Sequence, residues 1–584
     1  MVKGELNDIS EIIMNEDYYI YTVLYGGKAN KMIYSYEEEI IVVIINDTYA
    51  MAAIKSTVTQ EIGNTNTITM ILNEKIKKEG LNVYYVAPPE IFTLQETSAI
   101  EASQVSGVQL NLPLDLRGDG VTVAIIDTGI DYLNEEFRDI QGKTRIKYIW
   151  DQTLRPLKGE NVSFGRVYDS DEINKAIEAK KNNLNPYDIV PSVDKNGHGT
   201  NMAGIVGARG VNPEIMGMAP KCDFLIVKLS MATSYNNFFS NDIAKYNLAF
   251  IISALQYVKE YALKENKPVV ILLPIGTNSG NHKGKHILDS FIRNISRNVG
   301  IVVVSGAGNE GVQDAHASGM LKNIGDSDSI ELIVAPEQKN MLIEIWVDLP
   351  NILDIEIISP SGETTGVIPA ILNINKKYSF TFEQTEISTY YYLPEEYTGD
   401  ELIRVYLRNI QEGIWKVRLT LRLGQRAVYN AWILQKGLTT AGTRFTSSDS
   451  YGTIMVPGDS SNVITVAAYN QNNNNLLSYS GVAFREQYQN SIEFAAGGVN
   501  TKTTGLNNTI DIINGTSLSA AVGAGACCLL FEWGIVNKNY PYMYIQSMRT
   551  FLSRGTIERR GDIYPNPQWG FGILNVYKLF ENMK

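Results

Sequence analysis

The chain has 584 residues, too many for one ordinary domain of roughly 100–200 residues, and 44% of them are hydrophobic, enough to bury a large core. Its 51 basic and 63 acidic residues give a net charge of −12, which argues against nucleic acid or an anionic membrane as the main partner. The three cysteines, two of them adjacent, cannot form a disulfide framework.

The N-terminal part of the chain reads as a small α+β module. Strand patterns at 18–24, 39–45 and 82–87 surround a polar middle that is compatible with a helix. The first residues lack the long apolar core of a secretory signal, and the densest apolar runs, at 40–45 and 269–273, are far too short to span a bilayer. We therefore expect no secretion signal and no membrane span, and we assign residues 1–95 to this module.

From about residue 119 onward, strand patterns alternate with helical patterns. The strand patterns are short, rich in Val, Ile and Leu, and apolar on both faces, as in fully covered parallel strands: 121–126, 224–229, 269–273 and 301–304. The segments 242–264 and 285–298 repeat apolar residues at helical spacing. This alternation predicts an α/β fold with a doubly wound parallel sheet, in two pieces at 96–324 and 446–584.

Residues 325–445 change to a strict alternation of apolar and polar side chains. The apolar members of three such segments are Leu353, Ile355 and Ile357; Trp415, Val417, Leu419 and Leu421; and Tyr378, Phe380 and Phe382. Turn sequences such as Pro360-Ser361-Gly362 separate the segments. The pattern predicts an antiparallel β-sandwich inserted into the α/β core.

The predicted strand at 121–126 is followed by Asp127-Thr128-Gly129. A carboxylate at the carboxyl end of a parallel strand lies where α/β folds place ligands and catalytic groups. The triplet alone is ambiguous, because aspartic proteases also contain Asp-Thr-Gly and because an Asp-x-Gly after a strand is often a simple turn. An aspartic protease would need an all-β fold and a second such triplet or a homodimer, and no second Asp-Thr-Gly or Asp-Ser-Gly occurs.

His198 is the second candidate for chemistry. It lies in Asn196-Gly197-His198-Gly199-Thr200, before a run of small and apolar residues at helical spacing. The flanking glycines allow backbone to approach the imidazole closely, which favours a catalytic histidine over an ordinary surface or core one. A metal site is disfavoured, since no second histidine or cysteine lies at ligand spacing.

Ser517 lies in the segment Asn514-Gly515-Thr516-Ser517, followed by small residues up to Ala526. The small residues indicate a buried, tightly packed helix with Ser517 in its first turn. A plain helix N-cap at Thr516 or Ser517 is the alternative, but it explains neither the preceding Asn-Gly nor the small residues. A nucleophile at a helix N-terminus gains from the helix dipole as negative charge develops on the substrate.

The segment from Gly306 to Gly311 matches the G-x-G-x-x-G dinucleotide fingerprint after a predicted strand. A dinucleotide site would need a good helix next, and residues 312–324 are polar and interrupted by glycine. We favour the alternative in which the side-chain amide of Asn309 donates a hydrogen bond to an oxyanion.

Together these segments resemble the subtilisin family of serine proteases, over roughly residues 96–325 and 445–584. Asp127-Thr128-Gly129, His198-Gly199-Thr200 and Gly515-Thr516-Ser517 match the three signatures of the family, in the order Asp, His, Ser that is known for subtilisin. The resemblance implies a serine endopeptidase with Asp127, His198 and Ser517 as catalytic triad and Asn309 as an oxyanion donor.

The resemblance also implies a substrate-binding edge at Leu273, Pro274, Ile275 and Gly276, where a peptide would add as an extra strand. Residues 274–277 depart from the usual sequence of the family there, so the specificity pocket cannot be transferred. Calcium is common in the family, but no cluster of oxygen ligands stands out, and we expect neither a metal site nor a cofactor.

The N-terminal module resembles the propeptide of the family, an α+β chaperone whose tail enters the active site. The resemblance places a cleavage about thirty residues before Asp127, and we expect self-cleavage near Gln95. The module would then be a partner of the mature chain.

The inserted β-sandwich and the lack of a signal make the chain similar to the Csp germination proteases of clostridial spores. Their resemblance implies a jelly-roll insert, location in the spore, and a protein substrate that is the zymogen of a spore cortex-lytic hydrolase. Some members of that family have lost triad residues. The alternative function is therefore a catalytically silent regulator or receptor that retains the propeptide in its cleft.

Overall fold

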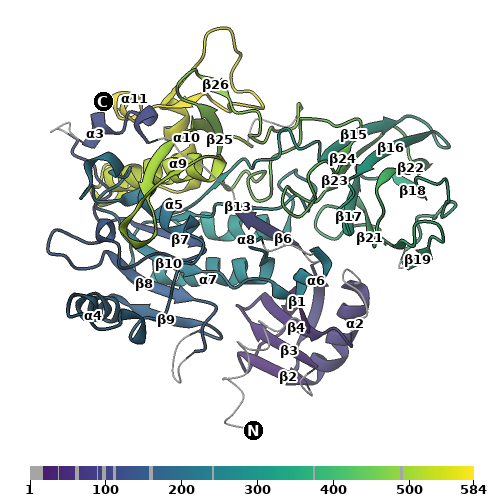
Figure 1. Ribbon diagram of the computed structural model, residues 1–584, viewed down its shortest axis with the longest axis horizontal. Helices are drawn as coiled ribbons and strands as arrows, with labels where there is room; N and C mark the ends of the chain where they lie inside the picture. The colour runs from purple at the N-terminus through teal and green to yellow at the C-terminus, as the bar shows by residue number, and fades with distance from the viewer. Residues whose placement is uncertain are drawn as a thin grey trace.

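The computed structural model describes residues 17–36, 39–58, 65–87, 90–94, 100–109, 114–156, 162–239, 243–372, 375–486 and 491–583. Figure 1 shows three parts: an α/β core that contains the C-terminus, a β-sandwich on the right, and the N-terminal module at the bottom. The module contacts both other parts.

The α/β core is built on one long sheet with the strand order β30-β31-β27-β25-β14-β12-β7-β10-β8-β9. Neighbours from β31 to β8 are parallel, and β9, β30 and β26 add antiparallel pairs. The parallel strands are β7 (Thr122–Asp127), β8 (Ile146–Asp151), β10 (Asp223–Lys228), β12 (Val269–Leu272), β14 (Ile301–Gly306), β25 (Ile464–Asn470), β27 (Phe494–Gly497) and β31 (Ile573–Leu574). The antiparallel strands are β9 (Arg166–Asp169), β26 (Asn475–Leu476) and β30 (Thr556–Ile557). The parallel sheet predicted from the apolar strands is confirmed.

Helices cover both faces of this sheet because side chains alternate along each strand. Val123 and Ile125 of β7 pack in one hydrophobic cluster with α5 (His198–Gly207) and α9 (Thr516–Phe531). Ala124 and Ile126 pack in another with α7 (Leu248–Glu265) and α8 (Ile287–Ser296). The remaining helices are α3 (Ser106–Gln109), α4 (Ser170–Lys181), α6 (Asn236–Phe239), α10 (Ile545–Arg554) and α11 (Val576–Glu581). The doubly wound arrangement is confirmed.

The predicted start of the helix at 242–264 is wrong. The helix begins at Leu248 because the side chain of Asn247 accepts a hydrogen bond from the amide of Ala249 at 2.9 Å and caps it there. Tyr246 and Asn247 instead form the short strand β11 (Tyr246–Asn247), and Asp242 lies outside the described residues.

The helix α9 is buried along its whole length, as its small residues predicted. Among the described residues, one helical stretch, Thr516–Val536, is long enough and apolar enough to cross a membrane. However, 83% of its most apolar part is buried inside the protein. It packs against α5 and the central strands. The stretch therefore has the burial of a central core helix.

The inserted part is a sandwich of two antiparallel sheets, as the alternation predicts. One sheet has the order β15-β23-β17-β21-β20-β19 and the other β18-β22-β16-β24. Their bounds are β15 (His316–Leu321), β16 (Ser327–Val334), β17 (Asn340–Val347), β18 (Ile352–Ile358), β19 (Asn375–Ser379), β20 (Glu386–Tyr392), β21 (Glu401–Arg408), β22 (Gly413–Leu423), β23 (Ala427–Ile433) and β24 (Arg444–Phe445). Apolar side chains of both sheets form one shared core. The strand β15 begins before residue 325 and belongs to the same sheet as β23.

One predicted alternation fails in this sandwich. β19 ends at Ser379, and Phe380 is buried while Phe382 is 80% exposed. The amide of Phe380 donates to the carbonyl of Thr385 at 2.9 Å, so the chain turns back after Phe380 toward β20. Phe382 therefore lies in the turn, where the period of a strand no longer applies.

The N-terminal module is an antiparallel sheet of order β2-β3-β4-β1-β5 with the helix α2 (Thr65–Ile76) on one face. Its strands are β1 (Tyr18–Gly26), β2 (Ile33–Tyr36), β3 (Ile40–Ile44), β4 (Tyr49–Lys55) and β5 (Asn82–Val86). Tyr21 and Ala52 pack toward α2, whereas Ile20 and Met51 pack into the cluster that contains α7 and α8. The sheet of the module is thus buried on both sides, and the α+β prediction is confirmed.

A buried ion pair also connects the segment after β5 with the α/β core. The Nε2 atom of His286, just before α8, lies 2.6 Å from Oε1 of Glu90. Burial lowers the pKa of His286, but the carboxylate of Glu90 outweighs this effect and raises it overall. The module also reaches the sandwich, where the hydroxyl of Tyr85 donates to Glu395 at 2.9 Å.

Candidate active site

Asp127 and His198 meet at the carboxyl end of the central strand. Asp127 is the last residue of β7 and His198 is the first residue of α5, and both are buried. The Nδ1 atom of His198 lies 2.8 Å from Oδ2 and 3.0 Å from Oδ1 of Asp127. This contact fixes the orientation of the imidazole and favours the tautomer with its proton on Nδ1.

The glycines around His198 are explained by close backbone contacts. A Cβ at Gly199 would lie 2.2 Å from the carbonyl oxygen of Gly129 and 3.2 Å from the Cβ of Asp127. Gly197, the residue before the helix, has a φ of 90°, a value that disfavours other residues. A close backbone approach is thus found at Gly199, against the turn after β7, whereas Gly197 is favoured by its φ.

Asp194 is a site residue that the sequence analysis did not identify. Its buried carboxylate accepts hydrogen bonds from the amides of Asn196 and Gly197 at 3.1 and 2.8 Å, and from the amide and hydroxyl of Thr200 at 3.0 and 2.7 Å. These contacts hold the turn before His198 and the first turn of α5. The sequence did contain a signal for this residue, namely an Asp four residues before the histidine. Such an Asp can be identified as a helix-capping residue only when the start of the helix is known.

Ser517 is the second residue of α9 and is fully buried. The N-cap position is occupied by Gly515, with a φ of 132° and no side-chain cap, so the N-cap alternative for Thr516 or Ser517 is wrong. The Oγ atom of Ser517 donates to the carbonyl oxygen of Pro274 at 3.4 Å. The serine thus lies beside the segment that follows β12.

Asn309 lies at the N-terminus of α9, near Ser517. Its Oδ1 atom accepts hydrogen bonds from the amide of Thr516 at 3.2 Å and from the hydroxyl of Thr516 at 3.3 Å. Because Oδ1 is engaged, the amide nitrogen remains as the donor of this side chain. After β14 the chain continues to β15 of the sandwich and not to a helix, which removes the structural basis for a dinucleotide site.

The four residues of the predicted substrate edge lie beside the tail of the N-terminal module. Leu273, Pro274, Ile275 and Gly276 are buried, and the last two form β13 (Ile275–Gly276). The strand β6 (Ile91–Leu94) pairs antiparallel with β13, with Leu94 opposite Ile275, and on its other side with β11. Gln95, the predicted cleavage position, lies outside the described residues.

The sandwich contacts the same region where the backbone amide of Lys436 meets Glu310. Its buried carboxylate accepts hydrogen bonds from the side-chain amide of Asn278 and from the backbone amide of Lys436, both at 3.3 Å. Burial raises the pKa of Glu310 to about 7, and the two donors reduce the increase. An acid that titrates near neutral pH therefore adjoins Asn309.

No metal centre was found within the described ranges, which contain no group of three or more His, Cys, Asp and Glu side chains suited to hold an ion. The side chains of this site can transfer a proton and donate hydrogen bonds. Asp127 and His198 form an acid–base pair, and Ser517 and Asn309 lie at the N-terminus of one helix. This combination suits nucleophilic attack on a carbonyl compound.

Comparison with known proteins points to one family. The model of the subtilase family matches residues 118–343 and 440–571. The structure of the CspB protease of Clostridium perfringens has a TM-score of 0.72 with 28% sequence identity, covering 83% of this chain and 99% of that one.

Two curated relatives match over shorter segments. The major intracellular serine protease of Bacillus subtilis is 26% identical over 199 residues, which cover 34% of this chain and 46% of that protein. The PII-type proteinase of Lacticaseibacillus paracasei is 24% identical over 265 residues, which cover 44% of this chain and 13% of that protein. The chain thus spans less than half the length of either curated relative.

Proposed function

Because the chain belongs to the subtilase family, we propose that it is a serine endopeptidase that uses Asp127, His198 and Ser517 as its catalytic triad. The observation that carries the proposal is the 2.8 Å contact between His198 Nδ1 and Asp127 Oδ2, made at the same sheet edge as Ser517. A buried carboxylate that holds a histidine beside a serine is the arrangement that activates a hydroxyl for attack.

In this reaction the hydroxyl of Ser517 attacks the scissile carbonyl carbon while Nε2 of His198 accepts its proton. A C–O bond forms, and the carbonyl oxygen becomes an oxyanion. Protonated His198 then donates the proton to the amine, which leaves as the C–N bond breaks and an acyl-enzyme forms. A water molecule, which gives its proton to His198, then attacks the acyl carbon, and the acid product and free Ser517 are released. Asp127 keeps the imidazole oriented and stabilises its positive charge.

The oxyanion is held by donors at the start of α9. The side-chain amide of Asn309 and the backbone N–H of Ser517 are the proposed pair, and the N-terminus of the helix adds a favourable dipole. The loss of one such donor typically reduces kcat by about 10²–10³-fold.

The first substrate is the N-terminal module itself. The strand β6 occupies the edge formed by β11 and β13 in antiparallel pairing, as a peptide substrate would. It runs toward Gln95, so the following peptide bond would be presented to Ser517. We infer that the module acts as a propeptide and that cleavage in cis near Gln95 is its maturation step.

The physiological substrate is proposed to be the zymogen of a spore cortex-lytic hydrolase, activated by limited proteolysis during germination, with the protein located in the spore. Support comes from the CspB protease, whose chain is matched over 99% of its length. Incubation of the mature chain with such a zymogen should yield a discrete, shorter product with cortex-lytic activity, and the Ser517→Ala chain should yield none. A zymogen that stays intact would refute this substrate.

A second candidate function follows from the same strand. Because β6 fills the substrate edge, a module that stays uncleaved would leave the protein a silent regulator with a closed cleft. The two functions differ in whether the peptide bond after Gln95 breaks.

The deciding experiment compares fragment masses of the wild-type chain and its Ser517→Ala variant after expression. A catalytic chain should split near Gln95, the Ser517→Ala chain should stay whole, and Ser553→Ala, a serine of α10, should split as the wild type does. If wild type and Ser517→Ala both stay whole, the silent regulator is favoured. If both split at the same bond, a foreign protease is responsible.

A further inference from the structure

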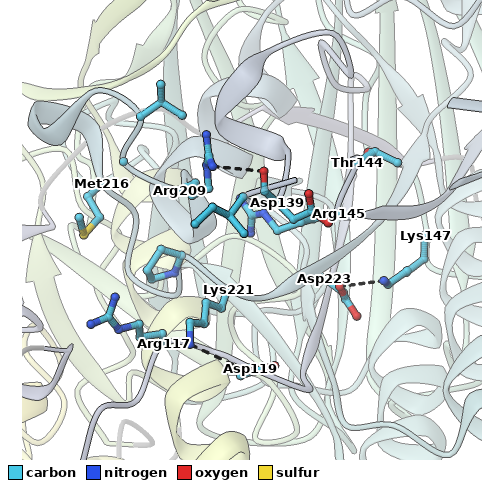
Figure 2. A pocket seen from close by; sticks show the side chains of 14 residues that line it. Arg117, Asp119, Asp139, Thr144, Arg145, Lys147, Arg209, Met216, Lys221 and Asp223 are labelled. Carbon is cyan, nitrogen blue, oxygen red and sulfur yellow. Dashed lines mark hydrogen bonds and ion pairs between the residues drawn. The ribbon is translucent and has the colours of Figure 1, made fainter. Parts of the chain in front are cut away.

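A second cavity lies far from the candidate active site. It has a volume of about 670 Å³ and opens at the amino ends of β7, β8 and β10 (Figure 2). Asp223, which lines the cavity, is the first residue of β10. Lys228, the last residue of β10, lies opposite Asp127 in the neighbouring strand β7. Five residues of strand separate the two ends by about 16 Å. The cavity is therefore distinct from the proteolytic site, and its volume lies within the range of small-molecule sites, about 300–1,000 Å³.

The lining of this cavity is cationic although the whole chain is acidic. Five basic and three acidic side chains line it: Arg117, Arg145, Lys147, Arg209, Lys221, Asp119, Asp139 and Asp223. Figure 2 shows two ion pairs among them, Lys147 with Asp223 at 3.0 Å and Lys221 with Asp119 at 4.0 Å. The other three basic side chains of the lining are the arginines. Among them, Arg117 forms an ion pair with Asp115, which is exposed and lies outside the lining.

Arg145 and Arg209 contact main-chain oxygens in place of carboxylates. Arg145 donates to the carbonyls of Cys222 and Glu136, both at 2.7 Å, and to that of Gly207. Arg209 donates to the carbonyl of Asp139 at 3.1 Å. Within the described part of the chain, no carboxylate forms an ion pair with either guanidinium. Burial lowers the pKa of Arg145, and the nearby charge of Arg209 contributes to the decrease.

The wall beside these charges is preformed and partly apolar. The carboxylate of Glu136 accepts the amides of Gly210, Val211 and Asn212 at 2.7, 3.0 and 2.8 Å, which fixes the loop after Arg209. Exposed apolar side chains line the cavity on this side, namely Val211, Met216 and Ile140. Clustered cations without carboxylate partners cost free energy that a bound anion would offset.

We propose that this cavity binds a small organic anion, whose acidic group meets the guanidinium of Arg209 and whose apolar part packs on Val211 and Met216. Arg145 supplies buried positive charge beneath the acidic group, since its own donors contact carbonyls. A guanidinium that donates to an acidic group forms the strong, charge-assisted type of hydrogen bond. The site is independent of Ser517 and therefore of the proposed proteolysis.

The test uses the full-length Ser517→Ala chain and the aromatic sulfonate 8-anilinonaphthalene-1-sulfonate as probe, followed by fluorescence and by titration calorimetry. One probe molecule should bind per chain. Arg209→Gln should weaken the affinity about tenfold, as expected for a lost hydrogen bond to a charged group. Lys416→Gln, an exposed lysine on β22 of the sandwich and outside the lining of this cavity, is the matched control and should bind as the parent does.

Two further arms keep the result decisive. Met216 lines the cavity with a side chain that is 39% exposed, so Met216→Asp, which adds a negative charge to the site and should also weaken binding, remains informative if Arg209→Gln fails to fold, which thermal unfolding would reveal. N-phenyl-1-naphthylamine, the uncharged analogue, should bind at least tenfold more weakly than the sulfonate. Equal affinity for the two probes, or probe binding that neither Arg209→Gln nor Met216→Asp weakens, would overturn the proposal.

Discussion

Asp194 shows how one carboxylate can determine the position of a catalytic group that it does not touch. Its two oxygens accept four hydrogen bonds from the turn and helix start that carry His198. We regard it as a positioning residue, because its contacts reach the backbone on both sides of the imidazole and not the reacting atoms.

Asp194→Ala should therefore reduce kcat more than it changes KM, and should lower the free energy of unfolding by about 1.5–3 kcal/mol, as for lost hydrogen bonds to a charged group. Asp194→Asn keeps one acceptor oxygen and should recover part of kcat. Steady-state kinetics on a peptide substrate and denaturant unfolding measure both effects. Unchanged kcat in a destabilised Asp194→Ala protein would leave Asp194 with a purely structural role.

Because the pKa of Glu310 is raised, we expect the free energy of unfolding to depend on pH. Its folded-state pKa of about 7 exceeds the value of 4.5 for an unperturbed Glu, so the folded chain binds more protons than the unfolded chain between these pH values. Stability from this group is therefore lost as pH rises from about 4.5 to 7, by up to about 3 kcal/mol. Glu310→Gln should flatten that decline in denaturant unfolding at several pH values. A decline as steep as that of the wild type would contradict the assignment.

At the scale of the element, α5 reaches its place only because its first turn contains a glycine. The Cβ that any other residue would add at Gly199 meets the backbone oxygen of Gly129, which cannot move without displacing the end of β7. The helix, the strand end and the Asp127–His198 contact are therefore coupled through one close approach.

Gly199→Ala should consequently move α5 away from β7 and abolish self-cleavage, with a loss of about 1–3 kcal/mol in unfolding free energy, as for overpacked sites. Fragment masses and thermal unfolding report the two effects. Gly366→Asn is the control, because a Cβ there meets nothing within 4 Å and Asn tolerates the positive φ of Gly366. Normal cleavage by Gly199→Ala would show that the backbone yields at this contact.

At the scale of the whole molecule, the module, the core and the sandwich meet around the substrate edge. The sheet of the module packs on α7 and α8, its tail pairs with β13, and Lys436 after β23 of the sandwich bonds to Glu310 beside Asn309. We therefore expect that cleavage near Gln95 alone does not release the module.

The cleaved module should co-elute with the remainder of the chain in gel filtration. Met51→Asp, in the face of β4 that packs toward α7 and α8, should weaken this association or free the module. Met70→Asp, on the exposed side of α2, is the matched control and should leave the association intact. Separation of the cleaved wild-type module from the core would contradict the expectation.

The sequence by itself determined the elements whose pattern is local. The doubly apolar strands predicted a parallel sheet, the alternation around Ile355 predicted a sandwich, and the glycines beside His198 predicted close backbone contacts. The pattern failed where a local turn interrupted it, as after Phe380, and where a cap decided a helix start, as at Asn247. Such boundaries depend on single hydrogen bonds that periodicity does not encode.

The tertiary structure alone decided which distant residues meet. The environment of Glu310, the pairing of β6 with β13 and the cationic cavity all join segments that are separated in the sequence, and no local spacing predicts them. The physical reason is that burial and hydrogen bonding depend on which surfaces the fold brings together, whereas strand and helix periods depend on neighbours along the chain.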